Sequence, residues 1–176
     1  MNLHHHPAIH TATLPDAARL NALICAGFQR YRDDPDVRRS HLLEGRYENV
    51  YVGRDRIPEL GEVLDHAVDL ARNILNEPDR PLRAGCWFND MPPGAATLPH
   101  SHDDDDELLS ATYYLQIPPN SGELILHDGA TRTVVTPAEG LFVFFPPDVI
   151  HEVTRNSSDR HRLSLGINIG PDDPPG

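Results

Sequence analysis

The second half of the chain is divided into short segments of alternating polarity, and this pattern limits the fold more than any other feature. Apolar and polar residues alternate within each segment, and proline, glycine or asparagine stands at most of the breaks. The candidate strands cover residues 82–89, 98–102, 109–117, 122–127, 131–136, 140–145, 150–154 and 162–169. Short strands separated by turns predict a jelly roll, in which two antiparallel sheets face each other.

The first half of the chain has a helical period instead. Apolar residues recur every three or four positions from Leu20 to Tyr31, after Pro15 and Asp16 at the expected first turn. A second stripe predicts a helix over residues 58–76, which Pro78 and Pro81 end. Residues 1–12 predict an extended arm, 32–45 a surface loop, and 49–53 a short strand. We therefore expect one domain over residues 1–176, with the arm and helices in 1–81 and the jelly-roll core in 82–170.

Composition limits the partners of this chain. Its formal net charge of −12 over 176 residues repels polyanions, so we expect no nucleic acid and no anionic membrane surface as a partner. No run of about 18 apolar residues is present, and residues 1–6 resemble no export signal. Cys25 and Cys86 are expected to be reduced thiols of a cytoplasmic protein. A small-molecule substrate remains, and an exposed sheet edge or the arm leaves a homodimer open.

Strand 162–169 indicates a polar interior. Leu163, Leu165 and Ile167 face one way, whereas Arg162 and Ser164 face the other. If the helices cover the apolar face, the polar face must line the space between the two sheets. A buried arginine is costly unless it binds something, so this face predicts a pocket.

Residues 99–107 contain the highest density of potential metal ligands in the sequence, with two histidines before an acidic run. Alternate residues of a strand project to the same side, so His100 and His102, or His102 and Asp104, can converge on one metal ion. His151, after the apolar strand 140–145, offers a third ligand. Two imidazoles and one carboxylate on one face are typical of non-haem Fe(II) oxygenases.

Four stretches resemble a known family. Residues 15–21 match its opening helix, and Trp87, Asn89, Gly94 and the His100-x-His102 pair match a W-x-N…G…H-x-H pattern. Residues 109–115 match an L-S-G-x-Y-Y-x strand, and residues 140–164 match an ending that joins a distal histidine to R-x-S. The chain resembles the Fe(II)- and 2-oxoglutarate-dependent oxygenases of the prolyl-4-hydroxylase-like type, in particular a small bacterial branch.

This resemblance implies a double-stranded β-helix, Fe(II), 2-oxoglutarate as cosubstrate and O2. It implies a dioxygenase that hydroxylates a small molecule such as an amino acid or a natural-product intermediate. Arg162 would bind the far carboxylate of 2-oxoglutarate, with help from the hydroxyl of Ser164. Tyr114 and Asn89 are further candidates for holding the cosubstrate.

The metal ligands depend on the alignment. Alignment from the tryptophan selects His100 and His102, whereas alignment from the Tyr-Tyr strand selects His102 and Asp104. We favour His102, Asp104 and His151, which supply the usual carboxylate and leave His100 as a neighbouring group or a substrate contact. A site of three histidines is the alternative.

Two other protein classes fit parts of the same pattern. A cupin-type dioxygenase or isomerase would use His100, His102, Glu107 and His151, but it leaves the Arg162-x-Ser164 motif unexplained. A non-catalytic jelly-roll binding module would be expected to have lost a ligand or the arginine, and neither is lost.

Overall fold

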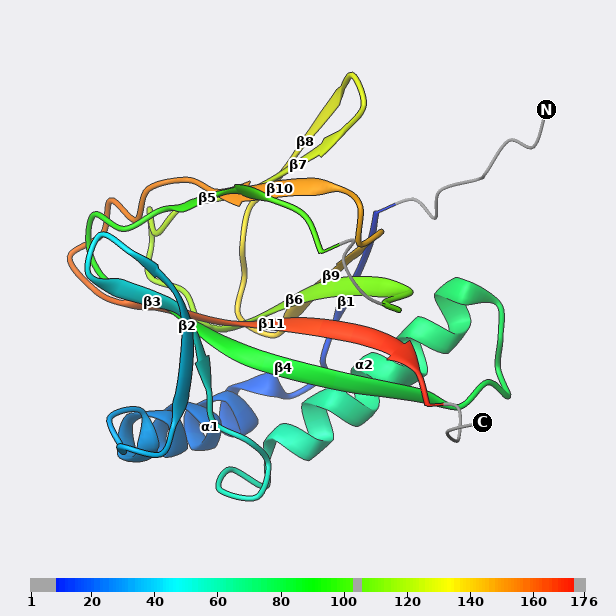
Figure 1. Cartoon of the computed structure of the whole chain (residues 1–176), viewed down its shortest axis with the longest axis horizontal. Helices are drawn as coiled ribbons and strands as arrows, with labels where there is room; N and C mark the ends of the chain where they lie inside the picture. Colours follow the sequence, from blue (N-terminus) through cyan, green and yellow to red (C-terminus); the bar gives the residue numbers. More distant parts are fainter. Residues whose placement is uncertain (1–8, 103–105, 173–176) are drawn as a thin grey trace.

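The computed structural model describes residues 9–102 and 106–172. Two helices and eleven strands make up these parts of the chain (Figure 1). In chain order they are β1 (His10–Thr13), α1 (Ala17–Tyr31), β2 (Arg38–Leu43), β3 (Arg46–Tyr51), α2 (Leu60–Leu75), β4 (Leu82–Met91), β5 (Thr97–His100), β6 (Leu109–Gln116), β7 (Leu124–Asp128), β8 (Thr131–Val135), β9 (Leu141–Phe145), β10 (Ile150–Val153) and β11 (Arg162–Pro171). None of these helices is long and apolar enough to cross a membrane.

The strands form two antiparallel sheets that face each other. The larger has the order β1-β9-β6-β11-β4-β3-β2, and the smaller has the order β5-β10-β7-β8. Figure 1 shows the smaller sheet above the larger one. The eight strands predicted between residues 82 and 169 are present as β4 to β11, and the jelly-roll prediction is confirmed.

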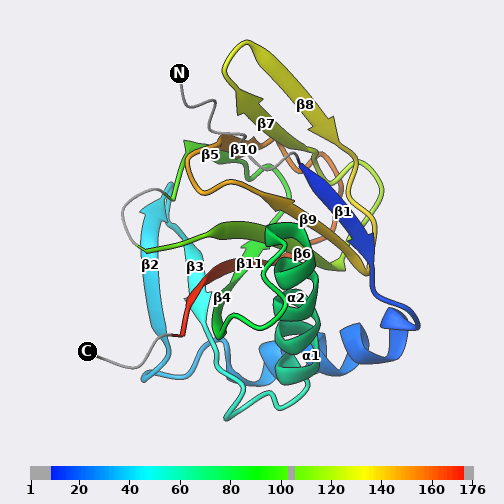
Figure 2. The same ribbon diagram turned by 90° about the vertical axis from the view of Figure 1, so that its right-hand side faces the viewer.

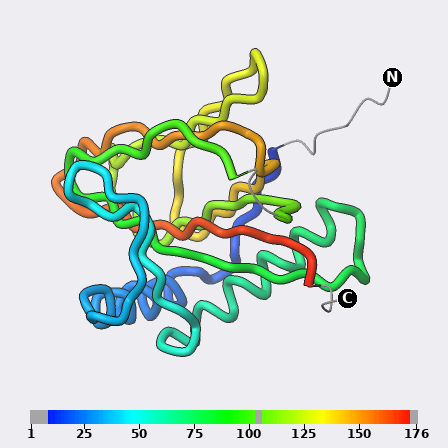
Figure 3. The backbone as a smooth tube through the Cα atoms, viewed as in Figure 1, coloured from blue at the N-terminus to red at the C-terminus, as the bar shows by residue number. Residues whose placement is uncertain are grey.

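The predicted surface loop over residues 32–45 is wrong, because β2 lies within it. β2 pairs with β3 through a two-residue turn in which Glu44 and Gly45 have φ values of 49° and 80°. Two positive φ values are what a tight hairpin turn requires. β2 has the sequence RRSHLL and no buried residue, so it lacks the alternating apolar pattern on which the prediction depended. Figure 3 shows this hairpin in cyan, rising from the larger sheet.

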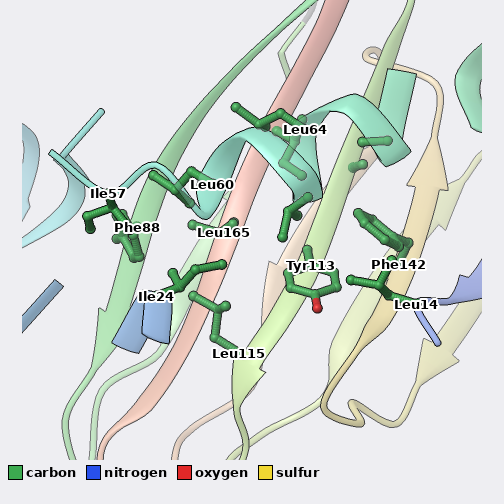
Figure 4. Close-up of a cluster of buried hydrophobic side chains, with 14 of the residues drawn as sticks. Leu14, Ile24, Ile57, Leu60, Leu64, Phe88, Tyr113, Leu115, Phe142 and Leu165 are labelled. Carbon is green, nitrogen blue, oxygen red and sulfur yellow. The ribbon is translucent and has the colours of Figure 1, made fainter. Parts of the chain in front are cut away.

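Both predicted helices cover the outer face of the larger sheet, as Figure 2 shows from the side. Ile24 of α1 and Leu60 of α2 are completely buried, and they belong to the same apolar cluster as Phe88, Tyr113 and Leu165 of the sheet (Figure 4). Burial of this kind of surface is the main stabilising contribution to folding. Cys25 and Cys86 pack against this cluster as free thiols, as predicted, and burial raises the pKa of each to about 11.

One buried amide fastens α1 to the sheet. Asn21 Nδ2 donates to the carbonyl oxygens of Tyr114 and Leu115, each at 3.2 Å, and Asn21 Oδ1 accepts from the hydroxyl of Tyr113 at 2.7 Å. Asn21 is 3% exposed, so these bonds replace water that the amide loses on folding. The contact fixes β6 against the helix layer, so that the next residue along, Tyr114, faces the interior.

Replacing Asn21 should therefore destabilise the fold. We expect Asn21→Ala to lower the free energy of unfolding by about 2–3 kcal/mol, because it leaves the Tyr113 hydroxyl and two strand carbonyls without their partner. Urea denaturation followed by circular dichroism measures this. The control is Asn73→Ala on the exposed side of α2, where we expect a change within about 0.5 kcal/mol. Equal effects of the two substitutions would contradict the role of Asn21.

Candidate active site

The two sheets bring histidines and an arginine to the same interior space. β5 and β10 are neighbours in the smaller sheet, and their register places His100 directly opposite His151. His102 follows the end of β5, where its backbone N–H donates to the carbonyl oxygen of Pro147 at 2.8 Å. Across the interior, β11 presents Arg162 and Ser164 from the larger sheet. The predicted polar face of residues 162–169 therefore lines the space between the sheets.

Three histidines cluster closely enough to share one ion. One ring nitrogen from each of His100, His102 and His151 lies within 4.8 Å of the other two. Among residues 9–102 and 106–172, this is the only group of three or more His, Cys, Asp or Glu side chains that meets this distance criterion. Two of the rings come from the neighbouring strands β5 and β10, and His102 follows two residues after the end of β5.

Hydrogen bonds select which nitrogen of each ring points into the site. His100 Nδ1 lies 2.8 Å from the carbonyl oxygen of Leu98, and His151 Nδ1 lies 3.0 Å from that of Val149. A carbonyl only accepts, so Nδ1 carries a proton in both rings, and in a neutral ring the lone pair is then on Nε2. His102 Nδ1 contacts the hydroxyl of Ser110 at 3.1 Å. This second layer of contacts is typical of histidines that bind metals.

The protonation state of the cluster also suits a metal. Burial, together with the neighbouring imidazole of His100, lowers the pKa of His102 to about 4 and that of His151 to about 3. At neutral pH both rings are therefore uncharged, and the uncharged imidazole is the form that coordinates a metal ion.

Arg162 lines the same cavity as the three histidines. The side chain is completely buried, and Nη1 donates to the carbonyl oxygens of Ser121 and Gly122 at 3.3 and 2.9 Å. Nε has no hydrogen-bond partner among the described residues. The buried hydroxyl of Tyr114 interacts with the guanidinium group, whose carbon lies 5.4 Å from the centre of the Tyr114 ring. No carboxylate in the described part of the chain forms an ion pair with Arg162.

This environment fits an anionic ligand. A buried guanidinium costs free energy unless an anion compensates its charge, and its planar donors match a carboxylate. The hydroxyl of Ser164 lies on the same face of β11, and Ser164 also lines the cavity. A small carboxylate placed beside Arg162 and Ser164 would supply the acceptor that Nε lacks.

A second, outer cavity of about 340 Å³ adjoins the inner one. The two cavities share Trp87, Asn89, Thr97, His100 and His102, so two of the three clustered histidines lie where the cavities meet. The β2–β3 hairpin, which the sequence did not reveal as such, forms one wall of the outer cavity.

Trp87 lies at the boundary between the cavities because its partner in β11 is a glycine. Gly166 is paired with Trp87, and a Cβ added to Gly166 would come within 2.3 Å of two indole carbons. The indole therefore lies directly over the β11 backbone. Its edge also meets the ring of His102, with a centroid distance of 5.4 Å.

Most of the site residues predicted from the sequence line one cavity, the inner one. His100, His102, His151, Arg162 and Ser164 all line the inner cavity, as does Asn89. The amide of Asn89 is already engaged, since Oδ1 accepts from Arg46 Nη1 at 2.9 Å and Nδ2 donates to Thr97 at 3.2 Å. Tyr114 lies beside Arg162 rather than on the cavity surface.

Neither of the two carboxylates predicted as metal ligands lies in the histidine group that the structure describes. Asp104, the favoured carboxylate ligand, lies outside the described residues. Glu107, the fourth ligand of the cupin alternative, accepts a hydrogen bond from the side-chain amide of Asn168 and does not belong to the histidine group. Arg46, which positions Asn89, was missed because no residue near it in sequence carries a recognisable motif.

Comparison with known proteins shows the fold. No protein-family model and no curated protein matches the chain. Among solved structures, a Pseudomonas putida prolyl-4-hydroxylase has a TM-score of 0.74 at 24% identity, over 96% of this chain and 95% of that one. The non-heme alpha ketoglutarate dependent carbocyclase SnoK from nogalamycin biosynthesis has a TM-score of 0.75 at 17% identity, over 96% and 81%.

A third structure was solved with ligands. The epimerase SnoN in complex with Fe3+, alpha ketoglutarate and nogalamycin RO has a TM-score of 0.72 at 17% identity, over 97% of this chain and 87% of that one. At these identities the likeness shows that this chain has the double-stranded β-helix fold of 2-oxoglutarate-dependent oxygenases.

The lowered histidine pKa values predict how stability depends on pH. His102 and His151 titrate near pH 4 and 3 when folded but near 6.5 when unfolded, so below pH 6.5 the unfolded state binds protons that the folded state does not. The free energy of unfolding of the metal-free protein should therefore fall as the pH falls from 6.5 to about 3. In His151→Gln this loss should be smaller by about 1–3 kcal/mol. Urea denaturation at several pH values measures it, and identical pH profiles would contradict the assignment.

Proposed function

We propose that this chain is an Fe(II)- and 2-oxoglutarate-dependent oxygenase of the cytoplasm that oxidises a small molecule. One observation carries the proposal: a single cavity holds three histidine ligand atoms at one place and a buried arginine without a carboxylate partner at another. A metal site alone would not require the arginine. An anion site alone would not require three clustered imidazoles.

His100, His102 and His151 are the residues that would hold the metal. Imidazole nitrogen binds Fe(II) well, and three ligands on one side of the ion leave positions for other molecules. Bound Fe(II) and 2-oxoglutarate would supply activation of O2, with oxidative decarboxylation of the cosubstrate coupled to oxidation of a substrate C–H bond. The hydrogen bonds to Leu98 and Val149 keep two of the rings in the orientation and tautomer that this requires.

Arg162 and Ser164 would bind the far carboxylate of 2-oxoglutarate, with Tyr114 beside them. The Nε of Arg162, which has no hydrogen-bond partner among the described residues, supports this assignment, because a carboxylate can accept from it. The carbonyls of Ser121 and Gly122 hold the guanidinium from behind. Asn89 would contribute to the wall of the cavity rather than to binding, since both ends of its amide are engaged. The SnoN complex, which contains alpha ketoglutarate and iron, gives the same fold a precedent for both ligands.

The remaining residues of the cavity would keep water out. Leu124, Phe145 and Val153 line its inner part, and all three belong to the interior apolar cluster. A dry surrounding strengthens the interaction between Arg162 and a carboxylate. The rigid strands on both sides hold these groups at fixed separations.

The arginine assignment predicts a large effect on cosubstrate binding. Arg162→Gln should weaken binding of 2-oxoglutarate to the Mn(II)-loaded protein by about 100-fold, because one buried charge partner is removed, while Mn(II) affinity stays within a few-fold. Isothermal titration calorimetry measures both constants. Arg160→Gln, two residues earlier on an exposed position, is the matched control and should leave both unchanged. Unaltered 2-oxoglutarate affinity in Arg162→Gln would contradict the assignment.

Single substitutions also distinguish the candidate ligand sets. His151→Ala and His100→Ala should each lower Fe(II) affinity by at least about 100-fold, since metal ligands contribute more than their neighbours do. Glu107→Ala should change it little. Competition with a fluorescent chelator under anaerobic conditions measures these affinities. A large loss in Asp104→Ala, with little change in His100→Ala, would instead select the set His102, Asp104 and His151.

A further inference from the structure

One residue of the β2–β3 hairpin has a backbone conformation that its place in a strand does not explain. His41 lies inside β2 and has a φ of 58°. The other described non-glycine residues with positive φ lie at helix ends or in turns: Asp16, Glu44, Asn76 and Asn120. The register of the hairpin skips His41, passing from the pair Ser40–Asn49 to the pair Leu42–Tyr47. Strained backbone of this kind clusters at sites where a protein holds a ligand.

His41 is one end of a chain of hydrogen-bonded side chains that crosses the hairpin. At the other end, Asn49 Nδ2 donates to the hydroxyl of Tyr51 at 3.2 Å. The Tyr51 hydroxyl lies 3.2 Å from that of Ser40, which lies 2.9 Å from His41 Nδ1. The guanidinium carbon of Arg38 lies 4.5 Å from the centre of the Tyr51 ring and helps to hold it. His41, Asn49 and Tyr51 all line the outer cavity.

The amide of Asn49 sets the direction of this chain. A side-chain N–H only donates, so the Tyr51 hydroxyl accepts from Asn49 and has its own proton available for Ser40. Ser40 then donates to His41 Nδ1, and each hydroxyl donates once and accepts once. In this arrangement the proton of the uncharged His41 ring is on Nε2. The chain therefore ends in a donor, His41 Nε2–H, and in an acceptor, Asn49 Oδ1.

A single arginine fixes the hairpin relative to the histidine cluster. Arg46 donates to Asn89 Oδ1 at 2.9 Å, and to the carbonyl oxygens of Asp90 and Ala96 at 3.2 and 3.0 Å. Glu48, which also lines the outer cavity, accepts from Arg46 at 3.1 Å. Because Asn89 lines both cavities, its contact with Arg46 connects the hairpin to the wall of the candidate metal site.

The two ends of the chain determine which ligands this wall can satisfy. An ammonium group only donates and would leave the His41 N–H without an acceptor, whereas a carboxylate only accepts and would leave Asn49 without a donor. A hydroxyl group can do both. Trp87 and Leu98 give the cavity an apolar lining on which a carbon skeleton can pack. Its volume of about 340 Å³ is near the lower end of the usual range for small-molecule sites, roughly 300–1,000 Å³.

We propose that the outer cavity is the substrate pocket, and that His41 and Asn49 bind an uncharged substrate with neighbouring hydroxyl groups. This inference rests on the proposed oxygenase function, because it places the substrate beside the metal. His41 Nε2–H donates to one hydroxyl oxygen of the substrate, and Asn49 Oδ1 accepts from a hydroxyl proton. The contacts through Ser40 and Tyr51 keep the His41 ring in the tautomer that this requires.

Three probes with the same ring and different charge test this directly: cis-1,2-cyclohexanediol, cyclohexylamine and cyclohexanecarboxylate. Each is added to protein loaded with Mn(II) and saturating 2-oxoglutarate, and paramagnetic broadening of the ring-proton NMR signals reports binding near the metal. We expect the diol to bind about tenfold more tightly than either charged probe, because each of these leaves one end of the chain unpaired. Equal binding of all three, tighter binding of a charged probe, or no binding of the diol would overturn the inference.

A substitution that keeps the backbone conformation identifies the group responsible. Asparagine adopts positive φ readily, so His41→Asn retains the hairpin but removes the Nε2–H donor, and the preference for the diol should be lost. His10→Asn, in β1 at the opposite edge of the larger sheet, is the control and should retain it. A preference that survives in His41→Asn would overturn the inference. Binding of Mn(II) and 2-oxoglutarate is measured first in the same samples, so that its absence contradicts the proposed function and not only the substrate class.

Stability separates a ligand-binding role of His41 from a structural one. Glycine adopts a φ of about 60° without steric cost, so His41→Gly should leave the urea midpoint of unfolding unchanged or raise it, while the preference for the diol is lost. A lower midpoint would mean that His41 serves the fold rather than the ligand, and would overturn the inference.

Discussion

The two faces of β11 organise this molecule. β11 is hydrogen-bonded along nearly its whole length to β4 on one side and to β6 on the other. Its leucines and isoleucines pack under the helices, which forces Arg162 and Ser164 into the space between the sheets. Because side chains alternate strictly along a strand, one set cannot be buried against the helices without turning the other set inward. The apolar contact of β11 with the helices thus places Arg162 and Ser164 inside the cavity.

The smaller sheet supplies the complementary half of the site. β5 and β10 carry His100 and His151 at facing positions, and His102 follows within two residues. These strands are separated by about fifty residues in sequence, so their pairing is stabilised only by long-range contacts. A one-residue shift of the register would turn one of the two histidines to the opposite face. The histidine cluster and Arg162 therefore lie on two different sheets, and the packing of these sheets sets the distance between them.

Much of this arrangement follows from the sequence, and some of it does not. The strands, the helices and the polar inner face of β11 could be predicted because they depend on local alternation, as in Leu163, Ser164 and Leu165. The grouping of His100 with His102 and His151 was one of two alternatives, since spacing alone does not show where β5 ends. The β2–β3 hairpin escaped prediction because its residues are mostly exposed and polar. Glu48 and Arg46, which lie on that hairpin, could be connected to the site only through the fold.

The central claim is that the histidine cluster and Arg162 act on one iron-bound cosubstrate. Anaerobic titration of the Fe(II)-loaded protein with 2-oxoglutarate tests it most directly, because chelation of the metal by 2-oxoglutarate produces a weak visible charge-transfer band. The account predicts a band that grows and saturates at one equivalent of 2-oxoglutarate per iron. Bound iron without any band at saturating 2-oxoglutarate would contradict it, and would instead favour a metal site of the cupin type.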